Sequence, residues 1–276
     1  MEFPKPDMRF FTGEVDVYPL NTEKGVGRAL HVLVYKLKPT SQEILRKTVT
    51  ALHDENMCQR YIGTVFNRKV ELPRGQLLVE KSPKEGEGSL TYRYSGICLE
   101  AVPAVKVGFM PLFEMAESLM MPGEKGFRGV LVNKYDNRDS VGWHSDRDPE
   151  QVEITGVICI SVGDGTVSFR RKKNVPGAEH FVLRKDIEVK DGEVYIMFGE
   201  EFQQYIEHAY LPLKKNVDGA TRTSLTFRRF SKHKAQKRKK NSATQSNKTP
   251  ADEEAHTAQV AKKARTGSHG HQEDEC

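Results

Sequence analysis

Gly129-Val-Leu-Val-Asn-Lys-Tyr135 is an apolar, strand-like run, and the polar turn Asp136-Asn-Arg-Asp-Ser140 follows it directly. Behind the turn stands His144-Ser-Asp146, in which a histidine and a carboxylate are two residues apart. Both residue types bind metal ions, and a strand and turn in front of them would fix their position. This stretch therefore predicts a β-structured domain with a metal site beside one of its strands.

Further along the chain, a second histidine and two arginines extend the pattern. His208 would complete the set of two histidines and one carboxylate with which non-haem Fe(II) oxygenases hold iron, leaving positions open for co-substrate and oxygen. Arg222 and Arg228 bracket Thr223-Ser-Leu-Thr-Phe227, a strand by composition, and residues six apart on a strand share a face. Each arginine could pair with one carboxylate of 2-oxoglutarate. The set predicts an iron- and 2-oxoglutarate-dependent dioxygenase.

Each piece of this pattern also has a simpler interpretation. A His-x-Asp pair is more often a turn with a solvated carboxylate, a single strand histidine is usually structural, and the second arginine could begin a basic tail. Two His-x-Glu pairs have the same spacing, His53 with Glu55 in a helical pattern and His271 with Glu273 in a charged tail. The oxygenase prediction therefore rests on the order and the strand setting of the whole set.

The chain resembles the AlkB family of nucleic-acid oxidative demethylases over roughly residues 70 to 230. The matching stretches are Leu72-Pro-Arg-Gly-Gln76, Leu90-Thr-Tyr-Arg-Tyr-Ser-Gly96, Asn133-Lys-Tyr135, His144-Ser-Asp146-Arg-Asp148 and Arg222-Thr-Ser-Leu-Thr-Phe-Arg228. One departure stands two residues after the first arginine, where the family often has Asn and this chain has Ser224. A hydroxyl there still donates a hydrogen bond, so we expect altered co-substrate affinity and retained activity.

The resemblance implies a double-stranded β-helix, or jelly roll, that uses Fe(II) with 2-oxoglutarate and O2 as co-substrates. It implies that His144, Asp146 and His208 hold the iron. It further implies that Arg222 and Tyr135 hold the distal carboxylate of 2-oxoglutarate, and that Arg228 and Asn133 contact the carboxylate next to the keto group.

The family's substrate contacts also have counterparts. Tyr92 and Tyr94 match its aromatic pair, and Tyr94 would face a flipped base opposite the ring of His144. Asp148 matches an acidic position that faces the exocyclic amine of the base, and Arg74 begins the nucleotide-recognition lid, where it would meet phosphate or an orphaned base. The alternative for the two tyrosines is that they only line a strand.

The resemblance thus implies removal of methyl groups from N1-methyladenine and N3-methylcytosine in DNA, a direct-reversal repair that releases formaldehyde, succinate and CO2. Alternatives remain open: methylated RNA bases as substrates, protein hydroxylation, or a β-barrel that binds nucleic acid without catalysis. The sequence does not distinguish DNA from RNA, single from double strands, or one methylated base from another.

The amino-acid composition indicates the kind of cellular compartment in which the protein works. The four cysteines are widely spaced and form no Cys-x-x-Cys pair, which argues against a zinc module or a disulfide framework and suits a reducing compartment. The first residues have neither the basic nor the apolar part of a secretory signal, and apolar runs such as 157–160 are too short to cross a membrane. We expect a monomer without membrane contact that binds nucleic acid.

The net charge of +5 is concentrated at the end of the chain. Residues 231–276 carry 10 Lys and Arg against 6 Asp and Glu, whereas the preceding residues carry 33 against 32. The end segment has one Val and no larger apolar residue, so its composition predicts disorder. Its basic clusters, 232–240 and 262–265, predict a protein of the nucleus and also of the cytoplasm, or a basic arm for nucleic acid; the alternative is a solvated tail without a partner.

We expect a mostly β fold with flanking helices, in three parts: an N-terminal extension with a strand and a helix (1–70), the dioxygenase domain (71–230) and the basic tail (231–276). A strand at 29–35, a helix at 41–55 with a capping box at Thr40-Ser-Gln-Glu43, and a helix at 105–121 are expected. The predicted jelly-roll strands are 128–135, 154–162, 166–173, 179–189, 193–198, 203–211 and 221–230.

Overall fold

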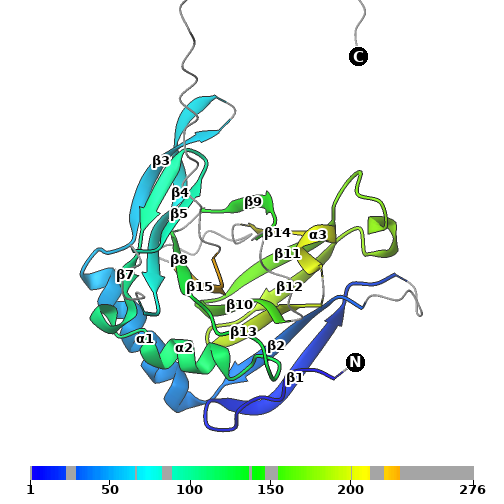
Figure 1. Cartoon of the computed structure of the whole chain (residues 1–276), viewed down its shortest axis with the longest axis horizontal. Coiled ribbons are helices and arrows are strands. Elements are labelled where there is room, and N and C mark those ends of the chain that lie inside the picture. Colours follow the sequence, from blue (N-terminus) through cyan, green and yellow to red (C-terminus); the bar gives the residue numbers. More distant parts are fainter. Residues whose placement is uncertain are drawn as a thin grey trace, which may run out of the picture. The chain divides into compact units, whose positions relative to one another are not determined.

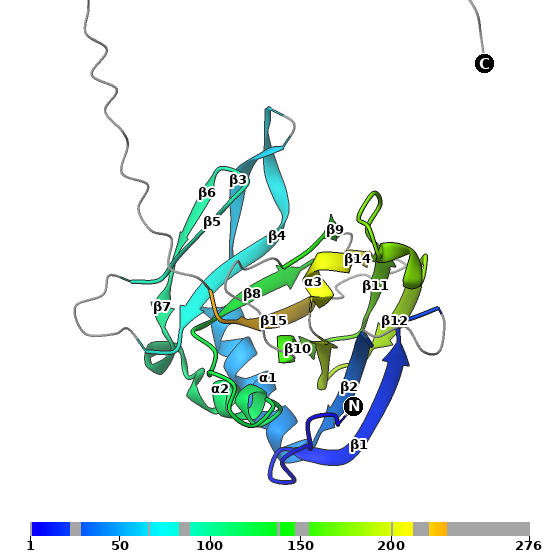
Figure 2. The ribbon, with the colours of Figure 1, turned by 45° about the vertical axis from the view of Figure 1, so that its right-hand side comes forward.

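The computed structural model describes residues 2–22, 29–65, 67–82, 89–136, 139–146, 155–199, 201–211 and 221–230. Met1–His233 forms one compact unit. Within its described residues, two antiparallel sheets pack against each other and helices cover the outer side of the larger sheet (Figures 1 and 2). Asp148 and the predicted disordered segment 231–276, with both basic clusters, lie outside the described residues.

The larger sheet contains eight antiparallel strands in a continuous path among the described residues. Its order is β1 (Phe11–Pro19), β2 (His31–Leu37), β13 (Glu193–Phe198), β10 (Thr155–Val162), β15 (Arg222–Arg228), β8 (Gly129–Tyr135), β4 (Arg68–Glu80) and β3 (Gln59–Val65). The short β7 (Val102–Pro103) adds a parallel pairing to the end of β4. The late strands β13, β10 and β15 thus lie between early strands of the chain in one sheet, as is typical of a jelly roll.

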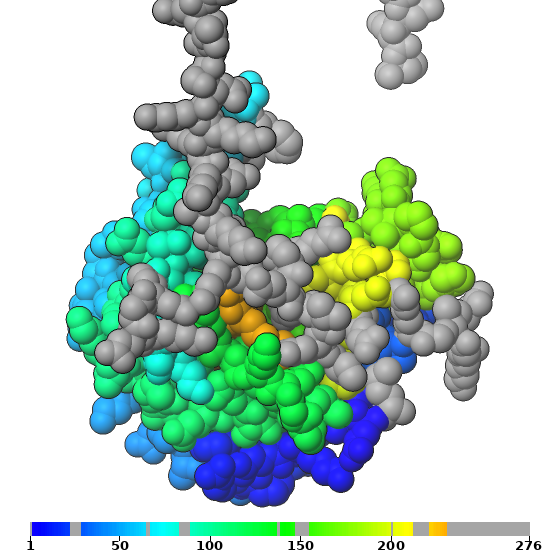
Figure 3. Space-filling view, viewed as in Figure 1, coloured from blue at the N-terminus to red at the C-terminus, as the bar shows by residue number. Residues whose placement is uncertain are grey.

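The smaller sheet has the order β12 (Lys185–Val189), β11 (Gly165–Arg171), β14 (Ile206–Leu211) and β9 (Val141–His144). A separate hairpin, β5 (Thr91–Tyr94) and β6 (Ile97–Glu100), turns at Ser95 and Gly96, which both have positive φ. The space-filling view shows two projections, cyan around β3 to β5 and lime green between β11 and β12, with the yellow surface of α3 (Phe202–Tyr205) between them (Figure 3).

Side chains along the strands of the larger sheet point alternately to its two faces. One face packs in the apolar core, and the other faces a cavity. In β15, Leu225 and Phe227 belong to the apolar cluster that packs against α1 (Pro39–Asp54) and α2 (Met110–Glu117). The residues between them face the other way, toward the smaller sheet, because neighbouring side chains on a strand point to opposite faces. A second cluster from both sheets, including Val157, Phe169 and Ile187, fills one end of the space between the sheets.

Most of the predicted strands are confirmed within a few residues, and two are shorter than expected. In 203–211 the first residues form the helical turn α3, and the strand begins only at Ile206. In 179–189 the chain first makes a 3-10 turn, η2 (Ala178–His180), before β12. Both segments contain enough apolar and aromatic residues for a strand, but these residues pack from a turn into the cluster between the sheets.

The helix predictions are confirmed in place and need correction at their ends. The first helix begins at Pro39 after an extended Lys38, and no side chain caps it, so the expected capping box is absent. Proline suits the first helical turn because it needs no N–H there. The second helix is divided into η1 (Ala104–Val107) and α2, because Gly108 between them has φ +69°. Met115 of this segment is buried in the core, and Met110 and Met120 pack against it.

The boundary expected at residue 70 falls inside β4, which runs from Arg68 to Glu80. Strands β1, β2 and β3 from the first seventy residues pair within the same sheet as the later strands, so the structure continues across that boundary. The N-terminal segment does supply the expected strand and helix, but as integral parts of the sheet and its cover. No helix among the described residues is long and apolar enough to span a membrane.

Candidate active site

The three predicted metal ligands lie together at the end of the smaller sheet. His144 on β9 and His208 on β14 are direct cross-strand partners, and Asp146 follows two residues after His144. One ligand atom from each residue lies within 4.8 Å of the others. The Asp146 carboxylate oxygens are 3.8 Å from Nε2 of His144 and 3.6 Å from Nε2 of His208. The pairing of two strands therefore creates the cluster.

Neighbouring groups fix the orientation of these ligands. Nδ1 of His144 lies 2.9 Å from the Gly142 carbonyl, and because a carbonyl only accepts, Nδ1 must carry the proton and leave Nε2 as the ligand atom. The backbone N–H of Asp146 donates to Oε1 of Gln203 at 2.8 Å, and the Ser145 hydroxyl donates to the Ile206 carbonyl. The turn α3 thus anchors the loop that carries Asp146.

The protonation states at neutral pH suit a divalent metal ion. Burial alone would raise the pKa of Asp146, but the charges of Arg228, His208 and His144 outweigh it and lower that pKa to about 2. Burial is the main cause that lowers the pKa of His208 to about 3. The site therefore presents an ionised carboxylate and a neutral imidazole, the forms that bind metal. Two histidines with one carboxylate form the donor set of non-haem Fe(II) sites.

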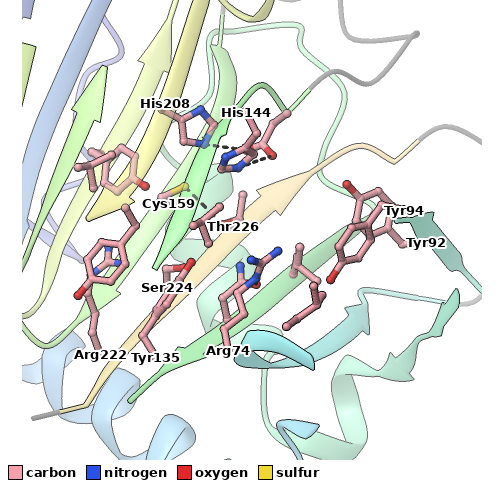
Figure 4. Close-up of a pocket in the computed structure, with 18 of the residues that line it drawn as sticks. Arg74, Tyr92, Tyr94, Tyr135, His144, Cys159, His208, Arg222, Ser224 and Thr226 are labelled. Carbon is pink, nitrogen blue, oxygen red and sulfur yellow. Dashed lines mark hydrogen bonds and ion pairs between the residues drawn. The ribbon is translucent and has the colours of Figure 1, made fainter. Parts of the chain in front are cut away.

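A cavity of about 240 Å³ extends from the ligands between the two sheets. It is lined by Leu72, Arg74, Tyr92, Tyr94, Ser95, Leu131, Asn133, Tyr135, Val141, His144, Asp146, Cys159, Val167, Tyr195, His208, Tyr210, Arg222, Ser224 and Thr226. Figure 4 shows the two histidines on one side of this space, Arg222 on a second side and the pair Tyr92 and Tyr94 on a third. One cavity thus joins the metal cluster to a cationic end and an aromatic end.

Arg222 forms the cationic end of the cavity. Its side chain is buried, with the guanidinium 4.4 Å from the Tyr210 ring centroid and Nε donating to the Ser161 hydroxyl at 3.0 Å. Its Nη2 is also buried and has no hydrogen-bond partner within the described parts of the chain. An unpaired buried donor of a charged group is costly, so this atom fits a bound carboxylate. The predicted dianion 2-oxoglutarate would supply one.

The predicted partners of Arg222 surround it. Tyr135 lies opposite Arg222 in the pairing of β8 with β15, and its ring centroid is 5.7 Å from the guanidinium. Ser224 is opposite Asn133 in the same register and forms a hydrogen bond that lowers the pKa of Tyr135, although burial raises it more. Ser224 therefore orients the tyrosine hydroxyl at the point where the family often carries an amide.

Arg228, which was expected to contact the carboxylate next to the keto group, lies beside the metal cluster. It is almost fully buried and does not line the cavity surface itself. Its Nη1 lies 3.4 Å from Oδ1 of Asp146 and donates to the Tyr92 hydroxyl at 3.2 Å. In this structure Arg228 therefore supports the metal carboxylate, and it lies close enough to the ligand cluster to meet a carboxylate bound beside the metal.

Arg74, which was expected to meet phosphate or an orphaned base, belongs to the cavity lining. It points into the cavity, where its Nε donates to Oδ1 of Asn133 at 3.0 Å (Figure 4). Gln76, which is fully buried, donates to the same oxygen at 2.8 Å, and the Tyr94 hydroxyl donates to Gln76. These bonds hold the amide of Asn133 in the cavity wall, so Arg74 acts as part of that wall.

Tyr92 and Tyr94 lie at the aromatic end, with stacked rings whose centroids are 5.2 Å apart. Both line the cavity that holds His144, as expected of a substrate-facing pair. Their hydroxyls are engaged inward, Tyr92 with Arg228 and Tyr94 with Gln76. Asp148, the predicted partner of the exocyclic amine, lies outside the described residues.

Several residues of the site had not been identified from the sequence. Cys159, Tyr195 and Tyr210 line the cavity, and Gln76 and Ser161 form hydrogen bonds with its lining residues Asn133 and Arg222. Polar residues at every second position of buried strands were the available signal, since Cys159 and Ser161 alternate with core residues in β10. Burial raises the pKa of the Cys159 thiol to about 11, so it stays protonated. Gly165 makes room for Tyr210 and Arg222, because a Cβ there would lie 2.6 Å from Cε2 of Tyr210 and 2.9 Å from Cδ of Arg222.

A jelly roll that opens onto a two-histidine, one-carboxylate cluster, with a buried arginine further inside, is the form of an iron-dependent oxygenase. Residues 30–228 match the model of the 2OG-Fe(II) oxygenase superfamily, and the chain belongs to this family. The predicted cofactor and co-substrates, Fe(II), 2-oxoglutarate and O2, are those of the family. The predicted fold class is likewise confirmed.

Two curated relatives are both described as alpha-ketoglutarate-dependent dioxygenase alkB homolog 3. The protein from Mus musculus is 29% identical over 150 residues, which cover 51% of this chain and 49% of that protein. The protein from Rattus norvegicus is 29% identical over 150 residues, covering 51% and 47%. The chain spans about half the length of these relatives, and they confirm its similarity to the AlkB family.

One solved structure, described as the structure of OsALKBH1, aligns with a TM-score of 0.43 at 19% sequence identity. The alignment covers 71% of this chain and 96% of that chain.

Proposed function

We propose that this protein oxidatively removes methyl groups from N1-methyladenine and N3-methylcytosine in DNA, releasing formaldehyde, succinate and CO2. The observation that carries the proposal is that the metal ligands, Arg222 and the tyrosine pair all line one cavity, and that Nη2 of Arg222 has no hydrogen-bond partner among the described residues. A reaction that joins a metal, a dicarboxylate and a flat substrate needs three such subsites within reach of one another.

His144, Asp146 and His208 would hold Fe(II) with the remaining positions open toward the cavity. The bound metal with 2-oxoglutarate would supply the oxidising chemistry, in which decarboxylation to succinate is coupled to transfer of one oxygen atom of O2 to a substrate C–H bond. The hydroxymethyl group left on the base nitrogen then breaks down to formaldehyde and the unmodified base. The chain itself contributes position, charge and the exclusion of water.

Arg222 would bind the distal carboxylate of 2-oxoglutarate through its Nη2 donor, which no described residue pairs with. The rings of Tyr135 and Tyr210 hold its guanidinium from the sides, so that little reorganisation is needed on binding. Asn133, whose oxygen is held by Arg74 and Gln76, would keep its amide N–H groups for the co-substrate.

A methylated base must leave the stack of its strand to reach a site of this depth. Tyr94 and Tyr92 offer it an aromatic wall on the side of the cavity away from Arg222 (Figure 4). Stacking of one base on an aromatic side chain contributes roughly 1–3 kcal/mol and does not depend on the base identity. This tolerance is compatible with both methylated adenine and methylated cytosine as substrates.

The proposal is tested by measuring formaldehyde released from matched DNA and RNA oligonucleotides that each contain one N1-methyladenine or N3-methylcytosine. Fe(II), 2-oxoglutarate and ascorbate are supplied, and Asp146→Ala serves as the inactive control. We expect iron-dependent release from DNA that the variant abolishes. Faster release from the RNA strands would show that RNA is the preferred substrate. Succinate formation without formaldehyde on any strand would contradict demethylation of these bases.

A further inference from the structure

A basic hollow lies on the outer face of the smaller sheet. It has a volume of about 820 Å³ and is bounded by Trp143 and by the chain between β11 and β12. Its lining contains five cationic side chains and one carboxylate: Arg170, Arg171, Lys172, Lys173, Arg184 and Glu179. Since residues 1–230 as a whole carry 33 cationic against 32 acidic side chains, this concentration of positive charge is local.

The hollow is directly connected to the metal cluster through the strands. Trp143 precedes His144 in β9, and Arg170 follows Phe169 in β11, so each pair points to opposite faces of the sheet. The ligand His144 faces inward while Trp143 faces outward, where the Arg170 guanidinium lies 4.1 Å from its ring centroid. A polymer bound in this hollow would contact Trp143, the residue next to the metal ligand His144 in the sequence.

The cations are held by different kinds of partner. Arg170 pairs with Glu207 at 2.8 Å and Arg184 pairs with Asp186 at 2.8 Å, so these two form a framework around Trp143. Arg171 and Lys172 donate to the backbone carbonyls of Glu179 and Gln203, which hold their side chains in place. Lys173 is exposed at the turn.

We propose that this hollow, defined by Trp143, Arg170, Arg184 and the turn 171–173, binds the sugar-phosphate backbone of the substrate strand beside the flipped base. The proposal rests on the proposed function, because it assigns the path of the same polynucleotide. Arg171, Lys172 and Lys173 contact phosphates, which position the strand without reading its sequence. Trp143, covered on one face by Arg170, contacts a sugar or a neighbouring base.

The test uses the full chain and unmethylated single-stranded DNA and RNA oligonucleotides. Trp143 is the single tryptophan of the sequence, so the intrinsic tryptophan emission reports this hollow alone. We expect saturable quenching by both oligonucleotides, weakening as salt rises. Each lost phosphate contact lowers the slope of log affinity against log salt by roughly 0.7 for single strands. Arg171→Ala/Lys173→Ala should therefore bind about tenfold more weakly, with a slope reduced by about 1 to 1.5.

Lys47→Ala/Lys106→Ala removes the same charge from exposed positions on α1 and η1 and serves as the matched control. Lys173→Glu, which changes only an exposed side chain, is the second variant if the double change unfolds. Equal affinities and salt slopes for the hollow and control variants, or unchanged tryptophan emission in the wild type, would overturn the inference. Binding that needs the hollow, in a protein that releases no formaldehyde, would overturn the proposed function instead.

Discussion

Arg228 Nη1 lies 3.4 Å from the carboxylate oxygen Oδ1 of Asp146, so the second arginine of the sequence pattern contacts a metal ligand. The same Nη1 donates to the Tyr92 hydroxyl, and the guanidinium lies 5.2 Å from the Tyr92 ring centroid. Arg228 thus links the aromatic end of the cavity to the metal cluster. A change at the tyrosine hydroxyl should therefore affect the co-substrate site through Arg228.

Tyr92→Phe tests this link. The variant keeps the aromatic ring and removes one hydrogen bond to a charged group, which contributes about 1.5 kcal/mol. We expect KM for 2-oxoglutarate to rise roughly tenfold, since 1.4 kcal/mol corresponds to a factor of ten, while KM for the oligonucleotide changes little. A raised oligonucleotide KM with an unchanged 2-oxoglutarate KM would assign Tyr92 to the base alone.

Arg222→Lys tests the cationic end of the cavity. Lysine keeps the positive charge but loses the planar fork that pairs with a carboxylate. We predict that KM for 2-oxoglutarate rises at least about tenfold, whereas Fe(II) binding measured by equilibrium dialysis stays the same. Arg46→Lys, a change within an exposed ion pair with Asp191, is the control and should match the wild type. Equal KM values for the two variants would exclude Arg222 as the carboxylate anchor.

Gln203→Ala tests how the loop of Asp146 is positioned. The Gln203 side chain accepts the backbone N–H of Asp146 at 2.8 Å, so its loss frees the ligand loop. Changes to groups that orient metal ligands typically cost 10–100-fold in metal affinity or activity. We expect a loss of that order in Fe(II) affinity, with Gln204→Ala on the same helical turn as the unaffected control. Unchanged affinity in Gln203→Ala would show that the sheet alone positions Asp146.

The metal-free protein should lose stability in acid. His208 has a pKa of about 3 in the folded protein against 6.5 as the ordinary value, and Asp146 has about 2 against 3.8. In both cases the unfolded chain binds more protons, so stability falls as pH decreases. The His208 contribution is lost from about pH 6.5 toward 3, and the Asp146 contribution from about 3.8 toward 2.

This prediction is checked by the unfolding temperature of the metal-free protein between pH 7 and the acid limit of folding. His208→Asn should show a shallower decline below about pH 6.5 than the wild type, because asparagine has no proton to gain. The half-buried His31 and His53, whose pKa values are also lowered by burial, remain in both proteins. Parallel curves for the two proteins would contradict the assignment of a buried, neutral His208.

The metal cluster and the strand-borne arginines could be predicted because strand periodicity fixes which side chains share a face. Arg222 and Arg228 do lie on one face of β15, as their spacing indicated, while Leu225 and Phe227 occupy the other. The alternation of side chains along a strand does not predict which part of the cavity each side chain reaches. In the structure Arg222 lies at the inner end of the cavity, and Arg228 lies against Asp146.

Other features depended on contacts between distant segments. Ser161 is 61 residues from Arg222 in sequence, and Gln76 is 57 residues from Asn133, so neither hydrogen bond is visible in local pattern. Arg74 was expected to meet phosphate or an orphaned base, and its hydrogen bond to Asn133 depends on the pairing of β4 with β8. The contact of Arg170 with the Trp143 ring likewise forms only through the pairing of β9, β14 and β11.

The most direct test of the account is the stoichiometry of the reaction on a DNA strand containing one N1-methyladenine. Formaldehyde, succinate and repaired base are measured together in the wild type and in Asp146→Ala and Arg222→Lys. We predict one formaldehyde and one succinate per repaired base, no turnover without Asp146, and recovery of Arg222→Lys at high 2-oxoglutarate. Repair that persists in Asp146→Ala, or that proceeds without succinate, would contradict the central claim that this cavity is the demethylase site.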